Sequence, residues 1–169
     1  SLEKIDEAKE IVQSALQLYP RNLLLNQYKI DLNEEKNIDV FSCKNENHVV
    51  AEILYIAANA LSSQSIYPLS NFYLNLAKFL NEDFHSFNIL LAENFYKIDN
   101  LKDSKKIYKN LSKRGEAFKW YSTKQLARIL TKEDNKDEAI KLASDAYKDL
   151  KNKEVYETFD YAEFLKNNE

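Results

Sequence analysis

The near absence of helix-breaking residues constrains this chain more than any other feature. Its 169 residues include one glycine and two prolines, whereas average usage is about 7% and 5%. Glycine and proline are the residues that most disfavour a helix interior. Because 44% of the residues are apolar, the chain can also bury a core. We therefore predict an all-α fold.

Apolar periodicity divides the sequence into about nine helices. The patterns predict helices at 2–19, 22–36, 47–64, 67–80, 84–98, 101–114, 116–132, 136–150 and 154–167. Gly115 is expected to take the left-handed conformation just past a helix end, and Asn100 and Asn135 to take it in two other turns. The segment 37–47, "NIDVFSCKNEN", lacks helical periodicity and is predicted to be an extended linker.

A pair of helical patterns recurs along the chain. In each second-helix pattern, a small residue precedes an apolar residue by four positions and another by seven. These patterns begin at Ser70, Ser104 and Ala139. The first-helix patterns that come before them carry their small residue at Ala58, Ala92 and Ala127. Small residues let two antiparallel helices cross closely, and large residues one turn away fill the space between neighbouring hairpins. The sequence therefore predicts stacked helical hairpins, each stabilised by its neighbours.

The recurring unit resembles the tetratricopeptide repeat, a helix–turn–helix unit of 34 residues. "AKEIVQSALQLYP" at 8–20 is similar to the second-helix signature of that family. The resemblance covers about 1–22 and 51–169, and it implies a right-handed α–α superhelix. It divides the chain into N-terminal half-repeats at 1–36, the linker at 37–47, and a hairpin region at 48–169 with units at 51–84, 85–118 and 120–153 and a half repeat at 154–167.

One irregularity concerns the start of the array. Ala8 and Ser70 are 62 residues apart, which is six short of two repeats. The first-type helix predicted at 22–36 is therefore expected to lack its second helix, and the linker is expected to stand in its place.

The family resemblance also implies a candidate binding surface. In tetratricopeptide arrays the first helices line a concave groove that binds extended peptides or partner helices. The corresponding positions here are Glu52, Tyr55, Asn59, Ser86, Ile89, Glu93, Tyr96, Lys97, Tyr121, Lys124, Arg128, Tyr156 and Phe159. Tyrosine is favoured at protein interfaces, although several of these rings could instead pack between repeats.

Motifs for catalysis or for cofactor binding are missing from the sequence. His48 and His85 are far apart, neither has a second ligand at metal-binding spacing, and Cys43 has no neighbouring histidine or aspartate. The sequence contains no glycine-rich phosphate loop, HExxH motif or calcium-loop spacing. We therefore expect a non-enzymatic chain that needs neither a metal nor a cofactor.

Charge leaves an alternative function open. The net charge of −3 comes from interspersed acids and bases, which gives no general reason to expect a nucleic acid. The lysine-rich stretch at 102–119 could nevertheless follow a phosphate backbone, and it consists of Lys102, Lys105, Lys106, Lys109, Lys113, Arg114 and Lys119. The main hypothesis is a scaffold that binds a protein partner. The alternatives are an RNA-contacting helical repeat and a regulatory repeat region of a larger enzyme.

Other features bear on the setting of the chain. It begins at Ser1 and contains no methionine, so we expect a piece of a longer protein. No stretch has the length of a membrane span or the pattern of a signal peptide, and the cytoplasm and the periplasm both stay open. The last predicted helix is apolar on nearly every side, so we expect it to be covered by a following helix or by a second copy in a dimer.

Overall fold

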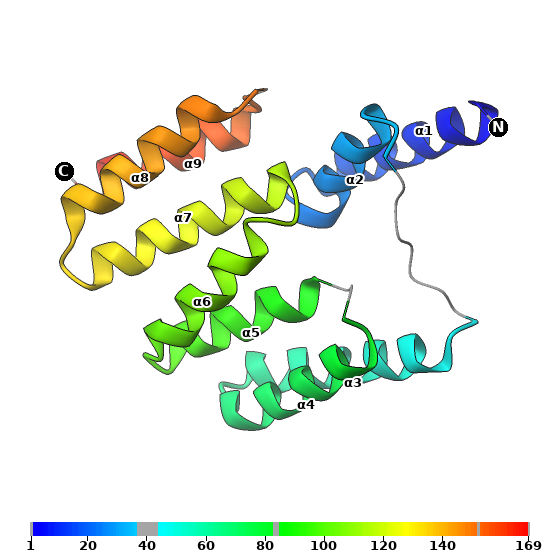
Figure 1. The fold of residues 1–169 in the computed structure, drawn as a ribbon, viewed down its shortest axis with the longest axis horizontal. Helices are drawn as coiled ribbons and strands as arrows, with labels where there is room; N and C mark the ends of the chain where they lie inside the picture. Colours follow the sequence, from blue (N-terminus) through cyan, green and yellow to red (C-terminus); the bar gives the residue numbers. More distant parts are fainter. Residues whose placement is uncertain (1, 37–43, 83–84, 152, 169) are drawn as a thin grey trace. The chain divides into compact units, whose positions relative to one another are not determined.

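The computed structural model describes residues 2–36, 44–82, 85–151 and 153–168. In these residues the chain is all-helical and forms nine helices without a β-strand, which confirms the predicted fold class (Figure 1). The helices are α1 (Leu2–Leu18), α2 (Leu23–Asn33), α3 (Glu46–Ser63), α4 (Tyr67–Leu80), α5 (Ser86–Lys97), α6 (Leu101–Leu111), α7 (Glu116–Lys132), α8 (Lys136–Asp149) and α9 (Val155–Lys166).

The helix ends lie within three residues of the predicted ones. The largest differences are at the ends of α2 and α6, which stop at Asn33 and Leu111. Most of the predicted linker, residues 37–43, lies outside the described residues. Helix α3 begins at Glu46, inside the predicted linker, because the side chain of Asn45 accepts hydrogen bonds from the first-turn N–H groups of Asn47 and His48.

Four helices end in the same way. After α2, α3, α5 and α7 the chain places one residue in the left-handed region, at Glu35, Ser65, Asp99 and Asp134. The residue after it donates its N–H to a carbonyl five positions back, as Asn100 does to Phe95 at 2.8 Å, which is the Schellman geometry. The prediction that Asn100 and Asn135 are left-handed is therefore wrong. Asn100 instead starts α6, where its side-chain oxygen accepts the N–H of Asp103 at 3.3 Å.

Gly115 also differs from the prediction. It does not close a helix with a left-handed residue but precedes α7 as its N-terminal cap, with φ 156° and ψ 172°. This region of the backbone map is used almost only by glycine, so the single glycine of the chain is needed at the start of a helix.

The contacts divide the chain into two compact units. Unit 1 comprises residues 1–38 and 112–169, and unit 2 comprises residues 39–111. The first two expected hairpins, α3–α4 and α5–α6, fall in unit 2. The third, α7–α8, falls in unit 1 together with α1, α2 and α9.

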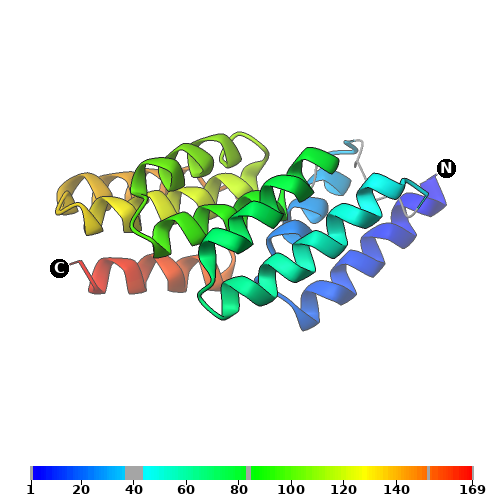
Figure 2. The same ribbon diagram turned by 90° about the horizontal axis from the view of Figure 1, so that it is seen from below.

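In unit 2 the helices pack as successive hairpins, and α3 and α4 run side by side in Figure 2. At the crossing of α3 and α4 the hydroxyl of Ser70 donates to the carbonyl of Ala58 at 2.8 Å. At the crossing of α5 and α6 Ser104 donates to Ala92 in the same way at 2.9 Å. The small residues of the recurring pattern thus lie where the backbones approach each other.

A buried amide joins the two hairpins of unit 2. Asn94 of α5 is 1% exposed and donates to Ser70 and to Asn71 of α4, both at 2.8 Å. Its side-chain oxygen accepts from Ser62 of α3 at 2.6 Å. Because a buried amide must find all of its partners, this network fixes how α5 sits on the α3–α4 hairpin.

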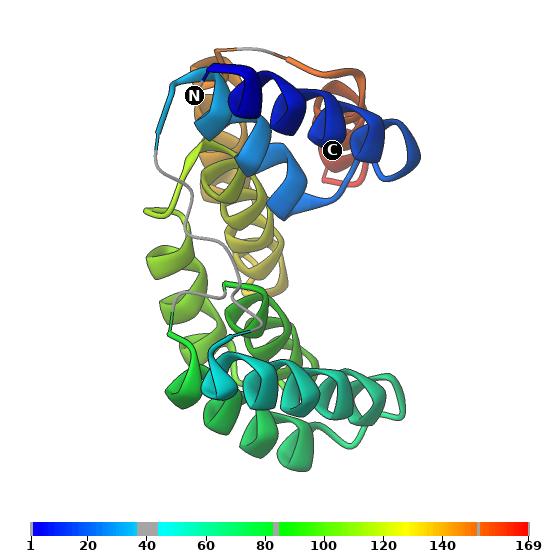
Figure 3. The same cartoon turned by 90° about the vertical axis from the view of Figure 1, so that its right-hand side faces the viewer.

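In unit 1, α7 pairs with α8, and α9 packs against α8. Ala127, Ala139 and Ala143 form the buried centre of this group, and the ring of Tyr147 stacks on that of Tyr161 at 4.4 Å. Helices α1 and α2 lie side by side, as Figure 3 shows. Helix α2 also packs on α7, so the N-terminal pair is part of the same unit as the C-terminal helices.

Candidate functional site

The residues predicted to line a groove lie on the four helices that were expected to be first helices. In unit 2, α3 and α5 carry Glu52, Tyr55, Asn59, Ser86, Ile89, Glu93, Tyr96 and Lys97. In unit 1, α7 and α9 carry Tyr121, Lys124, Arg128, Tyr156 and Phe159. The structure thus groups them into two sets, one in each unit, and a common groove stays a prediction.

The set in unit 2 combines rings that help to hold the fold with polar groups near the surface. The ring of Tyr55 packs on that of Phe87 with a centroid distance of 5.4 Å. Burial, followed by the nearby charge of Glu52, raises the pKa of Tyr55. The hydroxyl of Tyr108 donates to the carboxylate of Glu93 at 2.9 Å. Asn59 and Lys97 are exposed, so the accessible part of this surface is mainly polar.

The set in unit 1 is already in contact with the N-terminal part of the chain. Lys124 of α7 and Asp160 of α9 form an ion pair, and Arg21, which precedes α2, pairs with the same carboxylate at 2.9 Å. The hydroxyl of Tyr156 donates to the side chain of Asn26 on α2 at 3.2 Å. Of the residues expected to meet a partner, Tyr156 thus contacts α2 directly, and Lys124 shares the carboxylate of Asp160 with Arg21.

Electrostatics favour the hydrogen bond of Tyr156. Burial of the hydroxyl, followed by the negative charges of Glu157 and Glu154, raises the pKa of Tyr156 well above its usual range. The hydroxyl therefore stays protonated near neutral pH and is available as a donor to Asn26.

A polar contact between α2 and α7 involves Gln27. This side chain is 5% exposed, and its oxygen accepts the N–H of Ala117 in the first turn of α7 at 3.1 Å. A methyl group at Gly115 would overlap the side-chain amide of Gln27. The missing side chain at Gly115 therefore leaves the space in which Gln27 caps α7, while Lys29 pairs with Glu154 at 3.0 Å nearby.

A small pocket lies beside these contacts. It has a volume of about 190 Å³ and is lined by residues of α2, α7 and α9, among them Ile30, Ala117, Tyr156 and Glu157. Glu157 is 7% exposed, and its desolvation raises its pKa. One of its oxygens accepts the N–H of Glu154 at 2.9 Å, so this carboxylate has a clear structural role at the start of α9.

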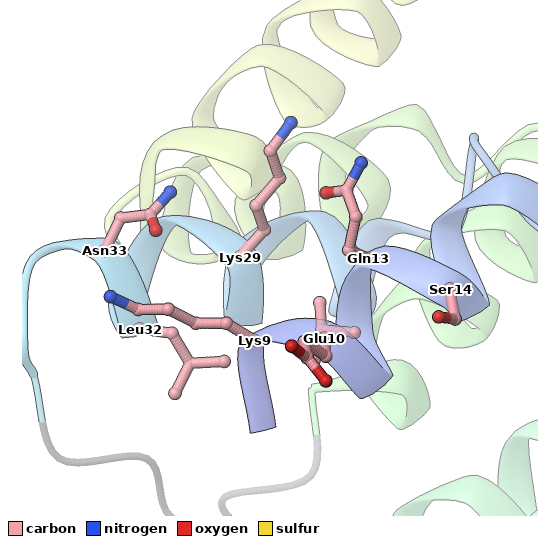
Figure 4. Close-up of a pocket in the computed structure, with 8 residues that line it drawn as sticks. Lys9, Glu10, Gln13, Ser14, Lys29, Leu32 and Asn33 are labelled. Carbon is pink, nitrogen blue, oxygen red and sulfur yellow. The ribbon is translucent and has the colours of Figure 1, made fainter. Parts of the chain in front are cut away.

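A second pocket, of about 470 Å³, lies between α1 and α2. Figure 4 shows Lys9 and Gln13 on α1 and Lys29 and Leu32 on α2. The lining mixes cationic, amide and aliphatic groups with the carboxylate of Glu10 and the hydroxyl of Ser14.

The structure gives little support to a metal site, a membrane span or a continuous lysine-rich surface. Among the described residues no group of three or more His, Cys, Asp and Glu side chains could hold a metal ion, and no described helix has both the length and the apolar character needed to cross a membrane. The lysine-rich stretch is divided, because Lys102 to Lys109 lie on α6 in unit 2 and Lys113, Arg114 and Lys119 belong to unit 1. Lys119 also pairs with Asp149 at 3.6 Å.

Comparisons with known proteins do not place the chain in a family. No family model matches the sequence, and a search of curated proteins gives no match either. The tetratricopeptide resemblance therefore rests on the sequence pattern.

Two features of the molecule were not foreseen from the sequence. One is the docking of α2, for which the lone glycine and the polar Gln27 within the apolar stretch "LLLNQYKI" were the available signals. The other is an exposed apolar face on α3 and α4. These helices contain more large apolar residues than one buried stripe requires, and that excess could have revealed the face.

Proposed function

We propose that this chain is a non-catalytic scaffold of the tetratricopeptide type that binds a helix of a protein partner on its first-helix surface. The observation that carries the proposal is the docking of α2 in unit 1. The surface of α7 and α9 there holds a helix through Asp160, Tyr156 and the N–H of Ala117. A surface that accommodates one helix of the chain itself has the shape and the polar groups to accommodate a helix of another protein.

The corresponding surface of unit 2 is the proposed site. On α3 and α5 it offers the carboxylates of Glu52 and Glu93, the exposed amine of Lys97 and the rings of Tyr55 and Tyr96. In unit 1 the docked segment supplies cations to carboxylates, as Arg21 does to Asp160. By the same chemistry, the expected partner is an amphipathic helix with basic and amide side chains on the face that meets α3 and α5.

The test compares two variants of the intact chain in affinity capture, followed by titration of the captured partner. The first variant, Tyr96→Ala with Lys97→Glu, changes the α5 surface. The matched control, Lys102→Glu with Lys106→Glu, changes exposed positions on α6. We expect the first variant to weaken binding at least about tenfold, because interface tyrosines are frequent hot spots, and the control to leave it unchanged. Equal binding by both variants would refute the proposed site, and loss of an RNA ligand in the α6 variant alone would favour the RNA alternative.

A further inference from the structure

Unit 2 exposes a continuous apolar stripe on each helix of its first hairpin. On α3 the stripe is formed by Val49, Val50, Ile53 and Ile56, and on α4 by Leu69, Phe72, Leu76 and Phe79. The exposed fractions reach 62% at Ile56 and 80% at Phe79. We call these eight residues the α3–α4 apolar face. Their spacing of three, four and seven positions is the spacing by which one helix packs on another.

The face lies on the side of the hairpin that is turned away from α5. The residues of α3 and α4 that meet α5 are others, namely Tyr55 against Phe87 and Ser62 and Asn71, which bind Asn94. The face is also distinct from the proposed binding surface, because Glu52, Tyr55 and Asn59 lie to one side of the stripe of Ile53 and Ile56 on α3.

The face is large enough to form a stable interface. Weighted by their exposed fractions, the eight side chains offer on the order of 700 Å² of accessible surface, close to the roughly 800 Å² that each partner contributes to a standard interface. The largest apolar patch on a typical monomer is roughly 300–600 Å². None of the eight residues is charged, so two such faces can meet without repulsion between like charges.

The register of the hairpin makes this face complementary to itself. Ser70 meets Ala58, so in the same antiparallel register Phe72 is at the same height along the hairpin as Ile56, and Phe79 is at the same height as Val49. If a two-fold axis runs along the hairpin, α3 of one copy lies over α4 of the other. Branched Val and Ile side chains then meet Phe and Leu side chains, which is the alternation of sizes that a packed interface requires.

We propose that two copies of this chain associate as a two-fold symmetric dimer through the α3–α4 apolar face. The occupant of the face is thus a second copy of the same hairpin, which has the required size, spacing and lack of charge. This interface is separate from the surface of α3 and α5 proposed to bind a partner, so either proposal can fail while the other holds.

Light scattering of the native 169-residue chain tests the proposal. At chain concentrations up to about 100 µM, where an interface with a micromolar Kd is populated, we expect a mass of twice 19.8 kDa. Phe72→Glu is expected to weaken the dimer more than about 100-fold, because an interface Phe is lost and a charge is buried in both copies. Phe159→Glu on α9 is the matched control, since both rings are 58% exposed, and it should leave the mass unchanged.

Circular dichroism of each variant shows whether the fold is retained, and Phe79→Glu gives a second variant at a more exposed position. The proposal is overturned if the native chain is a monomer at these concentrations, including a monomer in which the face is protected by unit 1. It is also overturned if Phe159→Glu dissociates the dimer while Phe72→Glu does not, since the C-terminal helix would then form the interface.

Discussion

Replacing Gly115 with alanine tests how α2 is held against α7. The backbone at Gly115 has φ 156° and ψ 172°, a region that costs other residues about 1–3 kcal/mol. The new methyl group would also overlap the side-chain amide of Gln27. Gln27 would then have to leave its position, and the N–H of Ala117 would lose its partner at 3.1 Å.

The expected loss of stability follows from these two effects. Loss of a helix cap costs about 1–2 kcal/mol, so with the backbone strain we expect Gly115→Ala to destabilise unit 1 by about 3 kcal/mol. For a chain of this length that corresponds to a fall in Tm of roughly 6–12 °C. Gln27→Ala alone should cost about 1–2 kcal/mol, because only the cap and the bond from Gln27 to Asp31 are lost.

A double-mutant cycle separates the contact from the backbone strain. In the Gln27→Ala background the methyl group at position 115 has no amide to displace, so the double variant should lose about 1–2 kcal/mol less than the sum of the single variants. Urea unfolding followed by fluorescence of Trp120 measures the effect in unit 1, because the only tryptophan of the chain lies on α7 and is 4% exposed. Arg114→Ala, at an exposed neighbouring position, should change stability by less than about 0.5 kcal/mol.

Additive losses would refute this reasoning. If the two single losses sum to the loss of the double variant within about 0.5 kcal/mol, Gln27 does not occupy the space above Gly115. If Gly115→Ala has no effect at all, the backbone conformation assigned to this residue is also wrong.

Three further predictions concern packing and pH. Asn94→Leu should destabilise α4 and α5 by about 2–4 kcal/mol, because the buried partners of the amide lose their hydrogen bonds; hydrogen exchange measures this, and unchanged protection of α4 would contradict it. Ala139→Ser should cost less than about 1 kcal/mol in urea unfolding, since the new hydroxyl can donate to the carbonyl of Ala127 as that of Ser104 does to Ala92. A much larger loss of stability would argue against equivalent hairpins. Glu157 has a pKa raised above 4.5, so its contribution to stability is greatest below that pH and declines as the pH rises through the raised pKa. Glu157→Gln should therefore raise Tm more at pH 7 than at pH 4. An equal change in Tm at the two pH values would contradict this prediction.

The helices could be predicted from the sequence because their positions depend on local information. Apolar periodicity and the scarcity of breakers fix each helix within a few residues, and the same small residues that marked the repeat lie at the helix crossings, as Ser70 and Ser104 do. The turns were less accurate, because aspartate and asparagine both tolerate the left-handed region. Which of the two adopts it depends on the start of the next helix, and Asn100 is needed there.

The candidate site was predicted less well because its contacts join distant parts of the sequence. The bond between Gln27 and Ala117 spans 90 residues, and that between Arg21 and Asp160 spans 139. Periodicity assigns a residue to a face of its own helix but does not say which other helix covers that face. The groove residues were therefore placed on the expected helices, and the helix at 22–36 was predicted, but its docking on α7 and α9 was not.

The docking of α2 also gives a physical reason for the irregular spacing at the start of the array. Helix α2 ends in the same Schellman geometry as α3, α5 and α7, with Glu35 in the left-handed region and the N–H of Lys36 bonded to the carbonyl of Asp31 at 2.9 Å. It therefore has the ending of a first helix. A first helix in a hairpin array is normally covered by its own second helix, whereas α2 is covered by α1 on one side and by α7 on another. If α2 is the first helix of a repeat without a second helix, as the spacing predicts, then α7 supplies the cover that this second helix would give.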